Sequence, residues 1–553
     1  MNKIIPFTRT GQLFLPLDNT LSFDFSPECY ATLQLLHSLD FSQFEKNQSN
    51  MGRPNAASPR QMMELIIYGK LLGYNSCREF LRLSTDICAR WILDGKKVPS
   101  YSTFARFIDQ NQDAIQSLFY QMNGKLQSMG ELKGETIYQD GTKIESASNK
   151  YTFVWRKGIQ KYMPKAFVHL QTLYKDFVEY FPASSFVEVL TEENALPVMM
   201  EIRRFLRKEI PGIDHARHGR GIRSNPIEKL FRDIEKYLES WIKYIMYNEM
   251  FENNNPTNRN SFSKTDTDAT FMHTKEDYMG NGQLKPCYNI QNLVDSNYIV
   301  STYCSADRTD YHTAVPALKK MQENLSIHYT NYCADSGYDC KENYEYLEKK
   351  GIKSFIKPQM YQENKKRKNR NDPSRRSNMK YRENFDAYEC TMGRLLIRRK
   401  DLEKQGRESS LKRGYKPKPN QRIYQSFIGC LDCPVRQQCM KSTAKKFDYK
   451  KLKVDTQLDM YRSNTLRNIE SIQGKIIRVN RSIQAEGSFA LIKDALSMRR
   501  FSRRGYKAVE TEWILCCMTA NTLRYMKRLA QGLVGSPFEY KIDIGQEEIP
   551  RAI

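Results

Sequence analysis

The sequence predicts an α/β protein whose core is a mixed β-sheet with helices on its faces. Helical spacing of apolar residues dominates the first part of the chain. Two runs rich in β-branched and aromatic residues, 284–294 and 297–304, follow one another as a hairpin. Helix and strand patterns then alternate from 310 to 358. Antiparallel strands followed by alternating helix and strand indicate a mixed sheet.

The N-terminal part of the chain, 1–130, is predicted to be a helical domain. Ser58 is expected as an N-cap, Pro59 takes the first helical position and Gln61 closes a capping box. A second capped helix begins in "VPSYSTFARF", and further helices run to about Met129. These short helices fit either a helix-turn-helix-like DNA-binding bundle or a purely structural cap, and the residues leave both interpretations open.

The remaining fold is predicted over 131–530, followed by a C-terminal tail over 531–553. Its first strand begins within "GETIYQDGTKIESAS". Charged helices over 157–260 are predicted to form a helical insertion. A second insertion, 360–455, is basic and bears cysteines, and its opening segment 361–382 is too charged to build a core. That segment is predicted to be a loop or arm.

Composition points to a polyanionic partner. The 553 residues include 87 Lys and Arg against 63 Asp and Glu, a formal net charge of +24, and nucleic acid is the first candidate for so basic a chain. A membrane surface is the second candidate. Against it, the chain start lacks a signal-peptide core and no run of about 18 apolar residues occurs. We therefore expect a cytoplasmic protein whose 13 cysteines are reduced thiols or metal ligands.

Four acids in the predicted sheet region are candidate site residues. Asp310 and Asp339 each precede a predicted helix, so both are explained as caps, Asp339 in a capping box with Glu342. Asp335 ends an apolar strand, where acids of α/β sheets face the ligand crevice, although local grounds alone favour an Asx-turn. Asp140 is followed by glycine, and Asp-Gly between two β-like runs taken singly favours a hairpin turn.

The combination of three stretches changes this balance. In order, "YQDGT", "ADSGYD" and "RSIQAEGSFALIK" resemble the DDE transposases of bacterial insertion sequences, whose catalytic domain has the ribonuclease-H-like fold. Residues 261–291 look like the second and third strands of that group, and 499–526 look like its closing helices. The helical N-terminal segment is similar to that of InsH-type transposases. The resemblance therefore covers most of the chain.

The resemblance implies that Asp140, Asp335 and Glu486 converge as catalytic residues. They would hold two Mg²⁺ (or Mn²⁺) ions, which take carboxylate oxygens and serve in-line displacement at a phosphodiester. Lys493 lies two helical turns after Glu486 and projects from nearly the same face. Arg481 stands one residue further from Glu486 than in the commonest signature of the group.

Basic residues around Glu486 are predicted to bind DNA phosphates, with a merely solvated surface as the alternative. They are Arg481, Lys493, Arg499, Arg500, Arg503 and Arg504.

The function implied is a transposase that cleaves double-stranded DNA at the inverted-repeat ends of an insertion sequence and joins the freed 3′-hydroxyl to target DNA. A homodimer is expected because two ends must be joined, and the protein would be associated with the nucleoid when bound to DNA. Two alternatives stay open: a non-catalytic, domesticated DNA-binding protein, and a ribonuclease-H-like nuclease without strand joining.

The second insertion holds a candidate metal site. In "CLDCPVRQQC", Cys430, Cys433 and Cys439 have a spacing that suits tetrahedral Zn²⁺, and Cys390 is a candidate fourth ligand. Ordinary reduced thiols are the equal alternative. Relatives of the resembled group have similar cysteine clusters at this place, which favours a structural role.

Overall fold

The computed structural model describes residues 24–45, 55–215, 225–252, 259–274, 280, 282–412 and 419–540. The N-terminal segment of this range is helical, as predicted. Its helices are α1 (Pro27–Leu36), α2 (Ser42–Glu45), α3 (Pro59–Leu71), α4 (Ile87–Ile92), α5 (Tyr101–Gln110) and α6 (Gln112–Ser128). The end of the predicted C-terminal tail, 541–553, lies outside the described residues.

The predicted helix starts are confirmed. Ser58 caps α3 by accepting the Gln61 backbone N–H, and the Gln61 side chain accepts the Ser58 N–H in return. This reciprocal pair satisfies two donors that a helix N-terminus otherwise leaves without partners. Ser100 caps α5 by accepting the Thr103 N–H. Local sequence chemistry therefore determines where these two helices begin.

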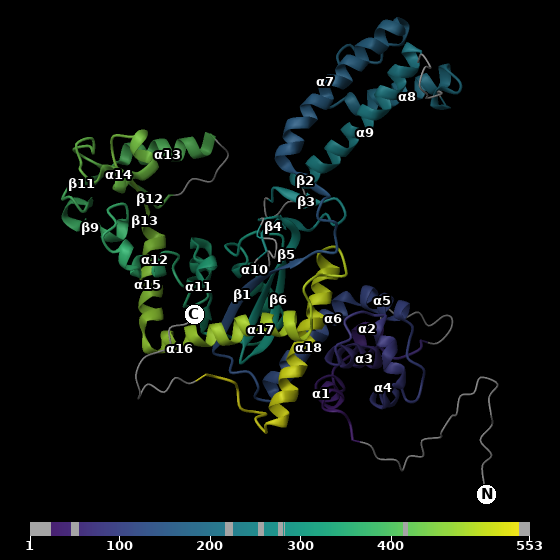
Figure 1. Ribbon diagram of the computed structural model, residues 1–553, viewed down its shortest axis with the longest axis vertical. Coiled ribbons are helices and arrows are strands. Elements are labelled where there is room, and N and C mark those ends of the chain that lie inside the picture. The colour runs from purple at the N-terminus through teal and green to yellow at the C-terminus, as the bar shows by residue number, and fades with distance from the viewer. Residues whose placement is uncertain are drawn as a thin grey trace.

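The central sheet is mixed and has the ribonuclease-H-like arrangement (Figure 1). Strand β5 pairs antiparallel with β1 on one side and with β6 on the other, while β7 and then β8 continue the sheet parallel to β1. The short strand β4 pairs with the start of β5. The strands are β1 (Thr136–Glu145), β4 (Thr270–Met272), β5 (Lys285–Asp295), β6 (Tyr298–Ser305), β7 (Asn331–Cys333) and β8 (Lys353–Ser354).

The predicted hairpin is present, and the stretch 261–291 contains β4 and the first part of β5. Ser296 and Asn297 take positive φ angles of 50° and 73° and connect β5 to β6 as a two-residue turn. Along the chain, β4 and β5 are the next two strands of this sheet after β1. Within 261–291, β3 (Ser261–Ser263) lies outside this sheet and β4 is only a short edge strand.

Helices cover both faces of the sheet. Ten of the eleven residues of β5 are buried, although successive side chains point to opposite faces. Helices α6, α10 (Ala314–Asn324) and α18 (Tyr506–Ala530) pack against β6, whereas α16 (Ile472–Arg481) packs against β1 and β7. Because α18 also contacts α1 and α3, the N-terminal helices and the sheet share one continuous hydrophobic core.

The helical insertion forms an arm away from the sheet (Figure 1). Strands β2 (Phe153–Trp155) and β3 pair as a ribbon at its base. The arm has its own apolar core around the buried Trp241. Its helices are α7 (Arg156–Tyr180), α8 (Ala195–Glu209) and α9 (Pro226–Glu252).

The second insertion contains a five-stranded antiparallel sheet, seen at the upper left of Figure 1. The basic stretch 361–382 is not an extended arm, because it folds into short helical turns and Arg376 forms an ion pair with Asp459. The elements are α12 (Tyr361–Lys365), β9 (Lys380–Arg382), β10 (Ala387–Glu389), β11 (Leu395–Arg398), α13 (Lys400–Lys412), β12 (Gln421–Ser426), α14 (Arg436–Met440) and β13 (Lys451–Asp455).

Helices connect the two sheets and complete the fold. Helix α11 (Lys341–Lys349) precedes β8 of the central sheet. After β13 of the small sheet, the chain returns through α15 (Thr456–Glu470) to α16. Among the described residues, no helix is both long enough and apolar enough to cross a membrane.

Candidate active site

Asp140 lies in the middle of β1, not in a hairpin turn. Strand β1 continues through Asp140 and Gly141, which pair with Asn292 and Gln291 of β5. Gly141 is needed at this position for a reason other than a turn. A β-carbon at Gly141 would stand 2.3 Å from Gln291 Nε2 and 2.8 Å from Asp310 Oδ1. Gly141 is therefore required by the close approach of these two side chains.

Asp335 lies just beyond the end of β7, beside β1. Its Oδ1 atom accepts the Gly337 N–H at 2.7 Å, so the Asx-turn favoured on local grounds is present. This turn does not exclude the ligand interpretation, since Asp335 and Asp140 line the same cavity. The turn instead holds the Asp335 carboxylate in place at the carboxyl ends of two parallel strands.

Glu486 enters the site on a helix that departs from α-helical geometry. A π-helical turn, η9 (Ser482–Glu486), follows α16 and is succeeded by α17 (Gly487–Ala490) and a second π turn, η10 (Leu491–Ala495). The Arg481 guanidinium donates from Nη2 to Glu486 Oε1 at 2.8 Å, and its Nη1 lies 4.0 Å from Asp140 Oδ1. One guanidinium therefore stands between two of the predicted catalytic acids.

Burial and the neighbouring charges shift the pKa of Asp140. Burial raises the pKa of Asp140 to about 6; Arg481 opposes this shift, and the negative charges of Asp335 and Glu486 add to it. Burial acts to lower the pKa of Arg481, but Asp140 above all the other acids keeps it raised. The Asp140 side chain is 18% exposed, whereas Glu486 is 55% exposed. The site thus combines a partly buried acid with one that faces solvent.

A cavity of about 390 Å³ joins acids and cations. Asp140 and Asp335 form its acidic side, and Lys493, Arg499 and Arg500 contribute cations to its lining. Lys493 lines this cavity from the second π turn η10, which replaces the regular α-helix assumed for its spacing. Glu486 does not line this cavity and is linked to it through Arg481.

The other predicted phosphate ligands are already engaged within the protein. Arg500 donates to the carbonyl oxygens of Ser146 and Ser148, and Arg504 donates to the carbonyl of Ala147. These contacts fasten the basic loop after η10 to the chain that leaves β1. Arg503 pairs with Asp109 of α5, and Arg499 pairs with Asp494. Their binding to DNA stays a prediction.

Asp310 is a site residue that the cap interpretation missed. The N-cap of α10 is Thr313, and the Asp310 carboxylate instead lines the cavity with Asp140 and Asp335. Its Oδ1 atom accepts hydrogen bonds from Asn289 Nδ2 at 2.8 Å and Gln291 Nε2 at 2.9 Å. A usable sequence signal existed, because Asp310 follows the end of β6, a strand that runs parallel to β1.

Asp339 is structural, as predicted, but for another reason. The N-cap of α11 is Cys340, without a side-chain hydrogen bond, so the predicted capping box is absent. The fully buried Asp339 carboxylate accepts two hydrogen bonds from Arg462 Nε and one from its Nη2, between 2.8 and 3.1 Å. Asp339 therefore ties α15 to the loop that follows Asp335.

The chemistry of these donors fits a hard divalent cation. Mg²⁺ and Mn²⁺ take carboxylate oxygens, and a bound cation would offset both the burial of Asp140 and the repulsion from Asp335 and Glu486, which together raise its pKa. Within the described ranges, no three His, Cys, Asp or Glu side chains stand close enough to hold an ion as they are. Glu486, held by Arg481, would have to turn toward Asp140 and Asp335 to complete such a site.

Two family models match the chain. Residues 25–110 match a transposase domain (DUF772), and residues 402–526 match a transposase DDE domain. The first match covers α1 to α5, and the second covers Arg481, Glu486 and Lys493 but begins beyond Asp140 and Asp335. No curated protein and no solved structure matches the chain.

Proposed function

We propose that this chain, which matches a transposase domain (DUF772) and a transposase DDE domain, is a DDE transposase that cleaves DNA at the ends of an insertion sequence and joins them to target DNA. The reaction would depend on divalent metal held by Asp140, Asp335 and Glu486. When bound, Mg²⁺ supplies the charge that activates an attacking oxygen and stabilises a leaving one at a phosphodiester.

One observation carries this proposal. Asp140 and Asp335, far apart in sequence, line one cavity together with Lys493 and Arg499. Acids that attract a cation and cations that attract a phosphate are thus arranged around the same space. A surface devoted only to binding DNA would not need partly buried carboxylates, which repel the phosphate backbone.

Asp140, Arg481, Lys493 and Arg499 would each have a different role in the reaction. Asp140 must lose its proton before it can bind a cation, and Arg481 helps by lowering its pKa against the effect of burial. Arg481 also positions the Glu486 carboxylate through their hydrogen bond. Lys493 and Arg499 would bind the scissile phosphate at the cavity wall.

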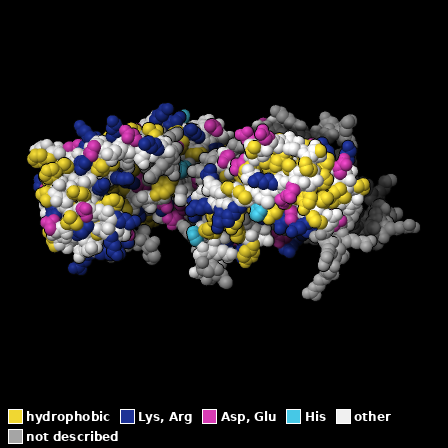
Figure 2. Space-filling view, turned by 90° about the horizontal axis from the view of Figure 1, so that it is seen from above, with side chains coloured by type: hydrophobic (Ala, Val, Ile, Leu, Met, Phe, Trp, Pro, Cys, Tyr) yellow, Lys and Arg dark blue, Asp and Glu magenta, His cyan; other side chains and the backbone are white. Residues whose placement is uncertain are grey.

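Double-stranded DNA would be held by surfaces beyond this cavity. On the face shown in Figure 2, Lys and Arg side chains are spread over the left part and the middle of the molecule. Such exposed cations bind phosphates without regard to sequence. The N-terminal helices are the proposed DNA-binding domain, and a homodimer would bring the two ends together.

The decisive experiment is Mg²⁺-dependent cleavage of DNA that carries the flanking inverted repeats. Wild type should cleave it, and Glu486→Gln should bind it with unchanged affinity but lose at least about 100-fold in cleavage rate, as expected for losing a group that acts in the transition state. Glu470→Gln is the matched control, because its side chain is 54% exposed, almost as much as Glu486. The control should cleave normally.

The outcomes separate the proposed function from its alternatives. Unchanged cleavage by Glu486→Gln removes Glu486 from the active site, and binding without cleavage by wild type indicates a non-catalytic DNA-binding protein. A second assay supplies DNA ends with the 3′-hydroxyl already exposed. Joining of these ends to a plasmid supports transposition, whereas cleavage without joining indicates a plain nuclease.

A further inference from the structure

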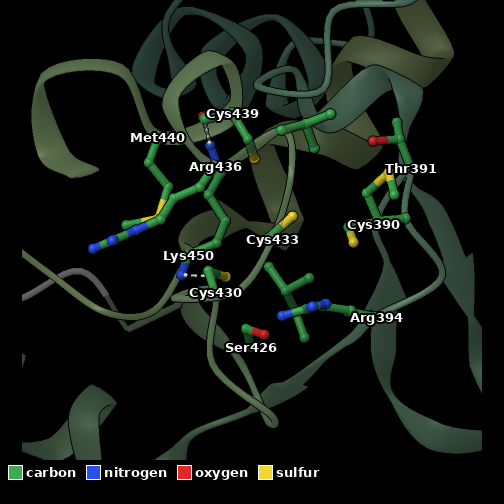
Figure 3. Close-up of a pocket in the computed structure, with 13 residues that line it drawn as sticks. Cys390, Thr391, Arg394, Ser426, Cys430, Cys433, Arg436, Cys439, Met440 and Lys450 are labelled. Carbon is green, nitrogen blue, oxygen red and sulfur yellow. Dashed lines mark hydrogen bonds between the residues drawn. The ribbon is translucent and has the colours of Figure 1, made fainter.

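The four cysteines of the second insertion meet around one small cavity, although they come from three separate parts of the chain. Cys390 follows β10, Cys430 and Cys433 lie in the loop after β12, and Cys439 lies in α14. Figure 3 shows Cys390 on one side of the cavity and Cys430 on the other. The cavity has a volume of about 20 Å³, which suits a single water-sized occupant.

We propose that Cys390, Cys430, Cys433 and Cys439 bind one structural Zn²⁺ ion that holds the small sheet together. Four thiolates are the ligand set of closed zinc sites. In the described ranges no three of these side chains already stand at ligand distance, so the thiols would have to turn inward to contact the ion. The cavity is too small for an iron–sulfur cluster, the other common partner of four thiolates.

Two backbone turns, one after Cys390 and one after Cys430, position the cysteines. The Cys390 carbonyl accepts the Gly393 N–H at 2.9 Å, and the Cys430 carbonyl accepts the Cys433 N–H at 3.3 Å. Gly393 has a φ of 73°, which a residue with a side chain rarely adopts. Each turn reverses the chain directly after a cysteine. The Lys450 N–H donates to Cys430 Sγ at 3.4 Å, which fixes the position of this sulfur beside the cavity.

The charges around the cavity also favour an occupied site. Arg394 and Arg436 line the same cavity. Four thiolates would repel one another without a cation, but one Zn²⁺ and these neighbouring cations would balance most of their charge.

The small sheet needs a metal ion to stabilise it because few of its apolar side chains are buried. No disulfide strengthens it, since all four of these cysteines are free thiols. Domains of this size usually depend on a metal, a disulfide or a larger core for their stability. The buried apolar side chains of the sheet are Met379, Leu396, Tyr424, Leu452 and Val454.

Metal analysis of the full-length protein tests the proposal. Wild type purified without chelator should contain about one zinc per chain. Cys430→Ser and Cys433→Ser should each lose most of it, because serine is a poor zinc ligand. Cys340→Ser is the matched control: this half-buried thiol donates to the Tyr311 carbonyl outside the cluster, and a hydroxyl can do the same. The control should retain its zinc.

A measurement on wild type covers the case in which the serine variants do not fold. Replacement of the bound metal by Co²⁺ should give thiolate-to-cobalt charge-transfer absorption. Mass spectrometry after alkylation should show Cys390, Cys430, Cys433 and Cys439 protected together until a chelator is added. Wild type without zinc and without the cobalt bands, or equal alkylation with and without chelator, overturns the proposal, as does iron in place of zinc. None of these readouts depends on DNA cleavage.

Discussion

Arg481 donates a hydrogen bond to Glu486 at 2.8 Å although the two residues are five positions apart on one helix. On a regular α-helix, residue i+5 points about 140° away from residue i. The π turn η9 removes this difference by widening the helix between them. In the commonest signature of DDE transposases, the Arg is one residue closer to the Glu. The π turn accommodates the extra residue of this chain and keeps the Arg481 and Glu486 side chains in contact.

Arg481→Ala should shift the pH dependence of cleavage upward. Arg481 opposes the rise in the pKa of Asp140, so its loss should move that pKa above 6 and leave less ionised Asp140 at neutral pH. Single-turnover cleavage at pH 7 should fall roughly tenfold or more, with partial recovery at pH 9. Arg481→Lys, which keeps the charge, should show a smaller shift. An unaltered pH profile in Arg481→Ala would contradict the proposed role.

Asp140→Asn should stabilise the metal-free protein. Between pH 4 and 6 the native state keeps a proton that the unfolded state has lost, so the free energy of unfolding falls as the pH rises through this window. The full effect is about 3 kcal/mol. In urea with EDTA, the variant should exceed wild type by roughly 1–3 kcal/mol at pH 8 and by little at pH 4. Equal stabilities at pH 8 would refute the elevated pKa.

Gly141→Ala should destabilise the protein and reduce cleavage. The new methyl group would overlap Gln291 Nε2, and Gln291 cannot move aside easily because it is fully buried and hydrogen-bonded to Asp310 and Gln139. The expected loss is about 1–3 kcal/mol in the free energy of unfolding. Gly124→Ala, in α6 with no atom within 4 Å of its β-carbon, should instead be neutral or slightly stabilising. Thermal unfolding of both variants decides the comparison.

Asp310→Asn and Asp310→Ala should separate a role at the metal from a role in packing. Alanine leaves the Asn289 and Gln291 amides without their acceptor, a loss of about 1–3 kcal/mol. Asparagine keeps one acceptor oxygen but removes the charge. If Asp310 contributes to the electrostatics of the cavity, Asn should raise the Mg²⁺ concentration needed for half-maximal cleavage. An unchanged Mg²⁺ requirement, together with lower stability, would identify Asp310 as purely structural.

Local sequence determined much of the fold because its signals act over a few residues. The Ser58 capping box, the Ser296–Asn297 hairpin and the charged helices of the arm each depend on neighbours in the chain, and all three are present. The pairing of the short edge strand β4 depends on the position of β5, which is not a local property of the sequence.

Tertiary structure alone decided how the candidate site is completed. The resemblance indicates Asp140, Asp335 and Glu486, whereas Asp310 reads as a helix cap in the sequence, because only the tertiary structure brings the residues after β6 to the cavity that Asp140 lines. The fit of Arg481 to Glu486 depended on a π turn that spacing rules for α-helices do not allow for. Sequence thus determines which residue types are available, whereas the order of strands and the pitch of a helix determine which of them meet.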